Sequence, residues 1–176
     1  NYGFDRQKMM TYLRNGIGIP ANGGFIPKGL PGFNPTIGFD YQPKKAKALV
    51  KQFKETTNIT NPEVTITTTS NYLSFCEYIQ RELQKSGLTV NVDVIPGATL
   101  KEAKANGKLN FFRASWIADY PDAENYLSLY YSKHFAPKGH NYTHFKNDLF
   151  DQLYEQAFTE TIQKYGKFTT PNWIRY

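Results

Sequence analysis

The chain has 176 residues, which is long enough for one domain with a hydrophobic core and a second small piece. Its formal net charge is +6, but the Lys and Arg residues are spread along the sequence, which disfavours a nucleic-acid partner and is typical of a solvated basic surface. No apolar run approaches the ~18 residues that a membrane-spanning helix needs.

The single cysteine, Cys76, excludes an internal disulfide and a cysteine-based zinc site. It falls in a segment with helical spacing of apolar residues, so we expect a buried and inert thiol. The opening Asn1-Tyr-Gly-Phe has neither a methionine nor a basic leader, and we expect it to begin inside a larger protein.

The first third of the chain predicts two helices separated by a long loop. Asp5 can cap a helix that runs to about Asn15. Residues 16–38 are so rich in glycine and proline that no regular structure is expected there, and their apolar side chains predict packing against a partner. Pro43 fits the first turn of a second helix over residues 44–56.

The middle of the chain alternates between strand and helix patterns. Strands are predicted over residues 64–69, 88–95 and 110–117. One helix, starting at Ser70 or Asn71 and ending at Gly87, follows the first strand, and a capping box at Thr99–Glu102 opens a shorter helix that ends near Gly107. This order predicts an α/β fold with a mainly parallel sheet flanked by helices.

The third predicted strand leads into the most informative stretch. Residues 111–117 are nearly continuously apolar around one charge, Arg113, as in a strand covered on both faces. Pro121 has no amide hydrogen and must end the strand, after which residue 122 or 123 caps a helix. Asp119 is therefore expected where the strand ends, at the sheet edge where open α/β sheets bind ligands.

Because parallel strands end at one edge, residues from all three strand ends are expected at a common rim. These residues are Ser70, Asn71, Pro96, Gly97, Asp119 and Tyr120. Further along, Asn147 caps a last helix.

The segment Arg113-Ala-Ser-Trp-Ile-Ala-Asp-Tyr-Pro-Asp resembles a segment of the extracytoplasmic substrate-binding proteins of peptide ABC importers, the oligopeptide- and dipeptide-binding proteins of family 5. The loop at residues 16–38 and the segment at 145–157 also look like this family. The resemblance implies that residues 1–158 form a ligand-binding lobe, one lobe of a periplasmic-binding-protein type II fold. Residues 159–176 remain a tail of uncertain assignment.

The resemblance also implies roles for individual residues. In oligopeptide-binding members, the aspartate of the Trp-x-x-Asp unit holds the α-ammonium group of the peptide, and it matches Asp119. The arginine three positions before the tryptophan lies in the same cleft, near the peptide carboxylate in some complexes, and it matches Arg113. Trp116 matches the pocket tryptophan. The candidate ligand-binding residues are Asp119, Arg113, Trp116, Tyr120, Ser70 and Asn71.

Residue types alone leave other interpretations open. Asp119 could be a carboxylate at a helix start, Arg113 a strand charge that faces solvent or is paired internally, and Trp116 a core residue. His134, His140 and His144 lie in a loop without a helix to align them, so no metal site and no cofactor are expected.

The resemblance implies a protein that captures peptides outside the cytoplasmic membrane and delivers them to the membrane subunits of an ABC permease. It implies a monomer without enzymatic activity, periplasmic or extracytoplasmic, and membrane-associated as a lipoprotein in the full-length form. The alternative is a carbohydrate-binding or carbohydrate-active domain that uses Asp119, Asp122 and the aromatic residues. A catalytic pair would need a fixed carboxylate spacing across a cleft, which the intervening Tyr-Pro disfavours.

Overall fold

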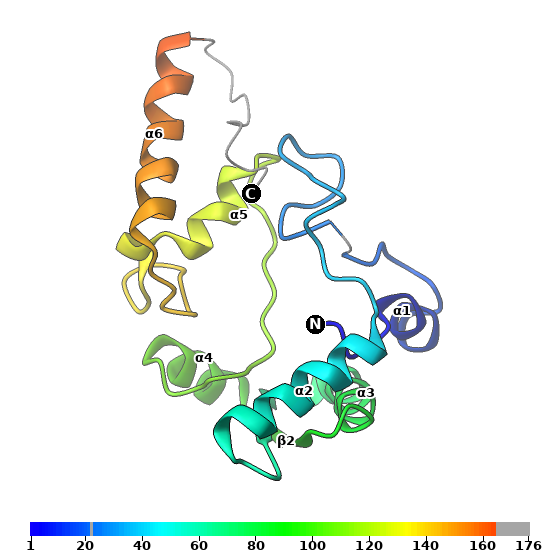
Figure 1. Ribbon diagram of the computed structural model, residues 1–176. Coiled ribbons are helices and arrows are strands. Elements are labelled where there is room, and N and C mark those ends of the chain that lie inside the picture. Colours follow the sequence, from blue (N-terminus) through cyan, green and yellow to red (C-terminus); the bar gives the residue numbers. More distant parts are fainter. Residues whose placement is uncertain (22, 165–176) are drawn as a thin grey trace. The chain divides into compact units, whose positions relative to one another are not determined.

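The computed structural model describes residues 1–21 and 23–164, and the chain divides into two compact units (Figure 1). Unit 1 contains residues 1–20, 39–102 and 109–114. Unit 2 contains the described residues of 21–38, 103–108 and 115 onward. The chain passes from one unit to the other at several points, and the last of them lies between Ala114 and Ser115, inside the stretch that resembles the peptide-binding family.

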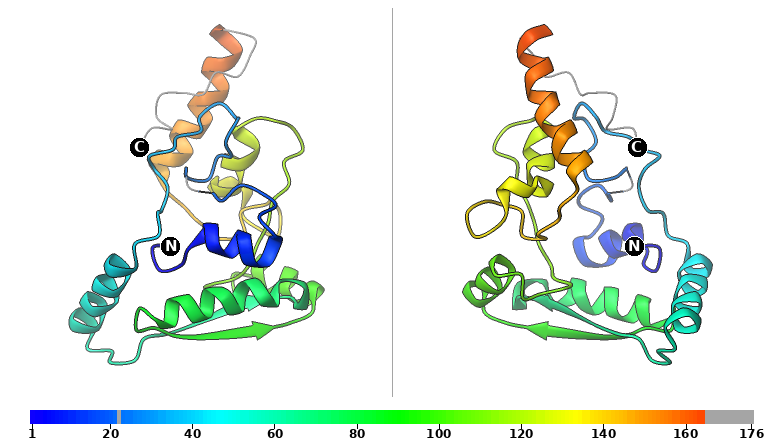
Figure 2. Two further views of the ribbon diagram at one scale, coloured as in Figure 1. Left: turned by 90° about the vertical axis from the view of Figure 1, so that its right-hand side faces the viewer. Right: turned by 60° about the vertical axis from the view of Figure 1, so that its left-hand side comes forward.

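A parallel pair of strands forms the centre of unit 1. β1 (Glu63–Thr68) pairs with β2 (Thr89–Val94) in a register that joins Glu63 to Thr89 and Thr68 to Val94. The connection between the strands contains η1 (Ser70–Tyr72) and α3 (Leu73–Gln84), and Figure 2 shows α3 lying along both strands. The predicted parallel α/β arrangement is confirmed for these two strands.

The core of unit 1 lies between α3 and the sheet. Ile66, Cys76 and Val90 are almost completely buried, and they are surrounded by partly buried apolar side chains of the same three elements and of Leu88, just before β2. β-branched residues suit this position because their side chains pack well on a pleated surface. The expectation of a buried thiol at Cys76 is confirmed.

The strand predicted over residues 110–117 is much shorter in the structure than expected. It is reduced to one parallel bridge between Phe112 and Thr67, on the side of β1 away from β2. Beyond Arg113, no residue of the segment pairs with a strand in the described part of the chain, and Ile117 is 89% exposed. The apolar run predicted burial on both faces, but hydrophobicity alone does not supply the ladder of hydrogen bonds that a strand requires.

Two further helices of unit 1 confirm the predictions made for them. α1 (Arg6–Arg14) begins at Asp5, whose carboxylate accepts a hydrogen bond from the backbone N–H of Lys8 at 3.0 Å. It ends at Asn15, which adopts the left-handed conformation with φ of 50°. α2 (Pro43–Thr57) begins at its proline, as expected.

The capping box predicted at Thr99–Glu102 is wrong. The helix α4 (Gly97–Ala105) begins two residues earlier, so Thr99 lies inside its first turn. The carbonyl of Pro96 accepts the backbone N–H of Leu100 at 2.9 Å, which is the first helical hydrogen bond. Pro96 and Gly97, expected only as the end of a strand, thus already start the next helix.

Unit 2 contains the described residues of the loop 21–38, three short helical elements and one longer helix. Ile26 is buried against Ala123, which confirms that this part of the loop packs, although Ile17 and Ile19 in unit 1 stay largely exposed. The helical elements are α5 (Glu124–Leu127), η2 (Ser128–Tyr130), η3 (Ser132–His134) and α6 (Asp148–Lys164). Among the described residues, no helix is both long and apolar enough to cross a membrane.

The last helix begins as predicted. Asn147 precedes α6, and its side-chain oxygen accepts the backbone N–H of Phe150 at 2.9 Å. α6 continues to Lys164, past the boundary expected at residue 158, while residues 165–176 of the predicted tail lie outside the described part of the chain.

The buried thiol gives a direct test of the core of unit 1. Ile66→Ala should lower the free energy of unfolding by ~2–4 kcal/mol, because it removes three carbons from a site that is 2% exposed. Cys76 should then react with a thiol reagent roughly 30 to 1,000 times faster, since each ~1.4 kcal/mol is tenfold in an opening equilibrium. Ile19→Ala is the matched control, because that side chain is 77% exposed. Equal labelling rates for both variants would contradict the assigned core.

Candidate functional site

The carboxyl edge of the unit 1 sheet gathers three of the predicted rim residues. Ser70 and Asn71 begin η1 directly after β1, and both are exposed. The backbone N–H of Ile95 donates to the carbonyl of Thr68 at 3.0 Å, so the chain after β2 stays beside the chain after β1. Gly97 lies close to this turn, because a Cβ built on it would be 4.0 Å from the methyl group of Thr69.

Arg113 is positioned at the same edge by its backbone. Its N–H donates to the carbonyl of Thr67 at 3.0 Å, and the N–H of Thr67 donates to the carbonyl of Phe111 at 3.0 Å. The guanidinium carbon of Arg113 lies 3.2 Å from the centre of the Tyr72 ring. Tyr72 was not predicted as a site residue. The sequence feature that could have identified Tyr72 is its place as an aromatic residue directly after Ser70-Asn71, where a β-branched strand ends.

Trp116 and Asp119 lie in unit 2, where Asn125 connects them. The side-chain oxygen of Asn125 accepts the indole N–H of Trp116 at 2.6 Å and the backbone N–H of Asp119 at 3.4 Å. Asn125 is 4% exposed, so both bonds are shielded from water. The Trp116 ring packs against His140, with 5.2 Å between ring centres. Asn125 was also missed, because nothing in the sequence distinguishes it from a surface asparagine.

The Asp119 side chain is exposed, and within the described residues no hydrogen bond or ion pair reaches its carboxylate. Its predicted place at the end of a strand is wrong, because the ladder stops at Arg113, in the other unit. The structure instead holds Asp119 by its backbone and leaves its charge available.

Tyr120 is held by Glu124, the first residue of α5. Its hydroxyl donates to one carboxylate oxygen of Glu124, and the hydroxyl of Tyr154 in α6 donates to the other. Burial raises the pKa of Tyr120, and the hydrogen bond to Glu124 raises it further. Burial also raises the pKa of Tyr154, and the hydrogen bond from Tyr154 to Glu124 raises it further. Both tyrosines are therefore neutral donors at physiological pH.

The predicted site residues thus fall into two groups. Ser70, Asn71 and Arg113 share one edge of unit 1. Trp116, Asp119 and Tyr120 lie on a short segment of unit 2 that Asn125 and Glu124 anchor.

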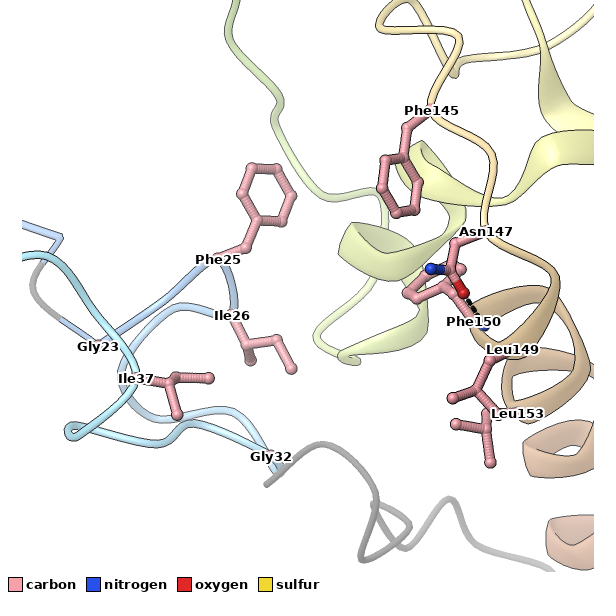
Figure 3. Close-up of a pocket in the computed structure, with 10 residues that line it drawn as sticks. All are labelled: Gly23, Phe25, Ile26, Gly32, Ile37, Phe145, Asn147, Leu149, Phe150 and Leu153. Carbon is pink, nitrogen blue, oxygen red and sulfur yellow. Dashed lines mark hydrogen bonds between the residues drawn. The ribbon is translucent and has the colours of Figure 1, made fainter. Parts of the chain in front are cut away.

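Unit 2 also contains an apolar pocket of about 340 Å³ (Figure 3). It is lined by Gly23, Phe25, Ile26, Gly32, Ile37, Phe145, Asn147, Leu149, Phe150 and Leu153. Asn147 is the one residue of this lining with a polar side chain, and its oxygen caps α6 (Figure 3). None of the predicted site residues lines this pocket, and its lining suits an apolar group rather than a charged one.

The histidines of the loop before α6 make local contacts. A ring nitrogen of His134 lies 3.2 Å from the carbonyl of Ser128, and one of His144 lies 3.2 Å from the carbonyl of Ala136. Among residues 1–21 and 23–164, no group of three or more His, Cys, Asp or Glu side chains is arranged to hold a metal ion.

The family model of the bacterial extracellular solute-binding proteins, family 5 Middle, matches residues 1–137 of this chain. The chain therefore belongs to this family, which is a family of binding proteins. This assignment gives no support to the alternative of a carbohydrate-binding or carbohydrate-active domain.

Individual relatives are longer than this chain. The protein named "Probable di/tripeptide-binding protein 5" of Pseudomonas aeruginosa is 23% identical over 155 residues, which cover 87% of this chain and 29% of that protein. The oligopeptide ABC transporter substrate-binding domain of Bacillus anthracis gives a TM-score of 0.79 at 20% identity, over 93% of this chain and 33% of that one.

A second solved relative is the periplasmic binding protein DppA of Helicobacter pylori in complex with the peptide STSA. It gives a TM-score of 0.69 at 27% identity, over 89% of this chain and 31% of that one. These likenesses confirm the expected fold, a part of the periplasmic-binding-protein type II architecture with its parallel sheet and flanking helices. This chain spans less than a third of the curated relative's length.

The Asn125 contacts predict a measurable effect. Asn125→Ala leaves the half-buried indole N–H of Trp116 without its acceptor, which should lower the free energy of unfolding by ~1–3 kcal/mol. The indole N–H resonance of Trp116 should also shift in the NMR spectrum. Asn106→Ala, at an exposed asparagine of the same unit, should change neither quantity. An unchanged indole resonance in Asn125→Ala would refute the assigned hydrogen bond.

Proposed function

We propose that the full-length protein captures peptides outside the cytoplasmic membrane and delivers them to an ABC permease. The observation that carries this proposal is the exposed, unengaged carboxylate of Asp119 within the Trp-x-x-Asp unit, in a chain of the solute-binding family. Two solved relatives support the ligand class, since DppA of Helicobacter pylori and OppA of Listeria monocytogenes are each described with a bound peptide.

Asp119 is the proposed partner of the peptide's α-ammonium group. Charge-assisted hydrogen bonds between an ammonium and a carboxylate are shorter and stronger than neutral ones. The hydrogen bond from the backbone N–H of Asp119 to Asn125 fixes the backbone that carries the carboxylate. Less conformational entropy is therefore lost when a ligand binds. The neighbouring Trp116, tethered by its indole N–H, provides an apolar surface beside the charge. Tyr120 is the further proposed contact in this group.

Arg113 is the proposed partner of a ligand carboxylate, because a guanidinium presents paired N–H donors that match two carboxylate oxygens. Ser70 and Asn71 lie exposed at the same edge and offer a hydroxyl and an amide to the ligand. Neither side chain carries a charge, so we expect them to orient the ligand more than to raise its binding affinity.

The location and partners belong to the same proposal. We infer a periplasmic or extracytoplasmic protein, membrane-associated as a lipoprotein in its full-length form, that acts as a monomer and meets the permease membrane subunits. The family's extracellular character supports the location. No covalent step is proposed.

Substitution of Asp119 tests the ammonium contact. In the full-length protein, Asp119→Asn should weaken peptide binding by ~1.5–3 kcal/mol, the contribution of a hydrogen bond to a charged group. Isothermal titration calorimetry measures this loss. Asp93→Asn, at an exposed aspartate of β2, is the control and should bind like the wild type.

N-acetylated peptides provide the second arm of this test. Acetylation removes the ammonium charge, so both the wild type and Asp119→Asn should bind such peptides equally weakly. If the substitution weakened acetylated and free peptides to the same extent, Asp119 would not be the ammonium partner.

The isolated chain gives a separate prediction. Residues 1–176 span less than a third of the curated relative, so most of the contacts that enclose a ligand are expected in the rest of the protein. The ordering cost of binding remains. We expect an affinity for a mixed peptide library no better than roughly millimolar, or ~−4 kcal/mol. A micromolar complex would mean that these residues carry a complete site.

A further inference from the structure

We propose that Tyr72 is a positioning residue for Arg113, holding its guanidinium flat so that the N–H edge selects ligands with a free carboxylate. This proposal rests on the proposed peptide-binding function and adds to it a residue that determines specificity. It is drawn from the contact between the two side chains, both of which belong to unit 1.

The position of Tyr72 follows from the end of β1. After Thr68 the chain stays extended at Thr69, with φ of −106° and ψ of 162°, and then turns into η1. The backbone N–H of Tyr72 donates to the carbonyl of Thr69 at 3.0 Å, which closes the turn. The Phe75 ring packs against the Tyr72 ring, with 6.2 Å between the ring centres. The backbone of Tyr72 is therefore fixed by the turn after β1, and its ring packs on Phe75 of α3.

Arg113 reaches the same strand by another route. Its backbone N–H bonds to the carbonyl of Thr67, which is 4% exposed, so water does not compete for this bond. The last residues of β1 thus position both side chains. Arg113 is hydrogen-bonded to Thr67, and Tyr72 follows the strand in the chain. Both side chains are half-buried.

A guanidinium group has two faces and an edge, and they bind different partners. The faces are weakly hydrated and stack on aromatic rings, whereas the edge carries five N–H donors. With its central carbon 3.2 Å from the ring centre, the Arg113 guanidinium uses one face on Tyr72. This contact leaves the N–H edge for a bidentate carboxylate.

The surroundings of Arg113 do not supply that carboxylate. Within the described residues, no oxygen accepts a hydrogen bond from the guanidinium, and no acidic side chain forms an ion pair with it. The ring stabilises the half-buried cation without neutralising it, since the attraction comes from the ring quadrupole. The arrangement therefore retains a full positive charge in a fixed orientation.

Loss of the ring should affect one class of ligand. Without Tyr72 the arginine side chain regains rotamer freedom, which must be lost again when a carboxylate binds. A ligand that lacks the carboxylate gains nothing from the oriented edge and should be insensitive to the ring. A residue that serves only folding would weaken both classes of ligand equally.

The experiment uses the full-length protein and calorimetry with two peptide libraries of two to four residues. The libraries are identical except that the C-terminus is a free carboxylate in one and an amide in the other. The wild type should prefer the free acids. Tyr72→Leu should reduce that preference by about 2- to 30-fold, the range that an arginine–aromatic contact is worth. Tyr72→Phe should restore it, because the ring face is kept.

Two further variants keep the test decisive. Tyr12→Leu makes the same change at an exposed tyrosine of unit 1 and should leave the preference unchanged. Arg113→Lys keeps the charge but cannot stack or form the planar fork, so it should lose the preference whether or not Tyr72 is present. If Tyr72→Leu does not fold, the combination of Tyr72→Phe and Arg113→Lys still decides the outcome. In that case a preference lost in Tyr72→Phe, or kept in Arg113→Lys, overturns the proposal.

The outcomes separate this proposal from the function on which it rests. Binding of neither library by the wild type would refute the peptide-binding function and this proposal together. Peptide binding with no preference for free acids, or with a preference that survives in Tyr72→Leu, would overturn the role of Tyr72 alone.

Discussion

Two backbone hydrogen bonds at Thr67 determine where the segment with the candidate residues Arg113, Trp116 and Asp119 leaves the sheet. They fasten Phe112 alongside β1, and they are the last strand-like pairing before the chain leaves unit 1. Side chains alternate between the two faces of a sheet, so a shift of one residue in this pairing would turn Arg113 to the opposite face. One buried threonine in the centre of a small sheet thus controls the direction of a charge that a ligand would meet.

The two units orient their candidate residues by different physical means. In unit 1 an aromatic face holds a cation, an arrangement that leaves the donors of the cation unused. In unit 2 one buried amide oxygen of Asn125 holds an indole and a backbone N–H, while the carboxylate of Asp119 remains outside this bonding. In both cases the anchor engages a part of the residue other than the donor or acceptor atoms that are proposed to bind the ligand. Under the proposed function, this separation of anchoring from binding would orient both charged groups before a ligand arrives.

Local signals in the sequence predicted the elements that depend on neighbouring residues. Asp5 and Asn147 cap helices as expected, and the β-branched run at residues 64–69 forms β1. The apolar run at 110–117 could not reveal that only Phe112 finds a partner, because strand pairing depends on residues distant in sequence. Tyr72 and Asn125 were missed for the same reason, since their roles exist only through tertiary contacts. The family motif supplied Arg113, Trp116 and Asp119, but not the residues that support them.

The order of the sheet has a consequence for how copies of the protein meet. Within the described residues, β2 has β1 as its sole strand neighbour, so its other edge is a template on which a second chain could pair. Two such edges face each other when two copies are related by a twofold axis and their β2 strands run antiparallel. A register that sets the exposed Asp93 of each copy opposite its counterpart would bring the two side chains to ~5 Å from each other, where like charges repel. Salt screens this repulsion. Self-association through β2 in this register should therefore be weakest at low ionic strength.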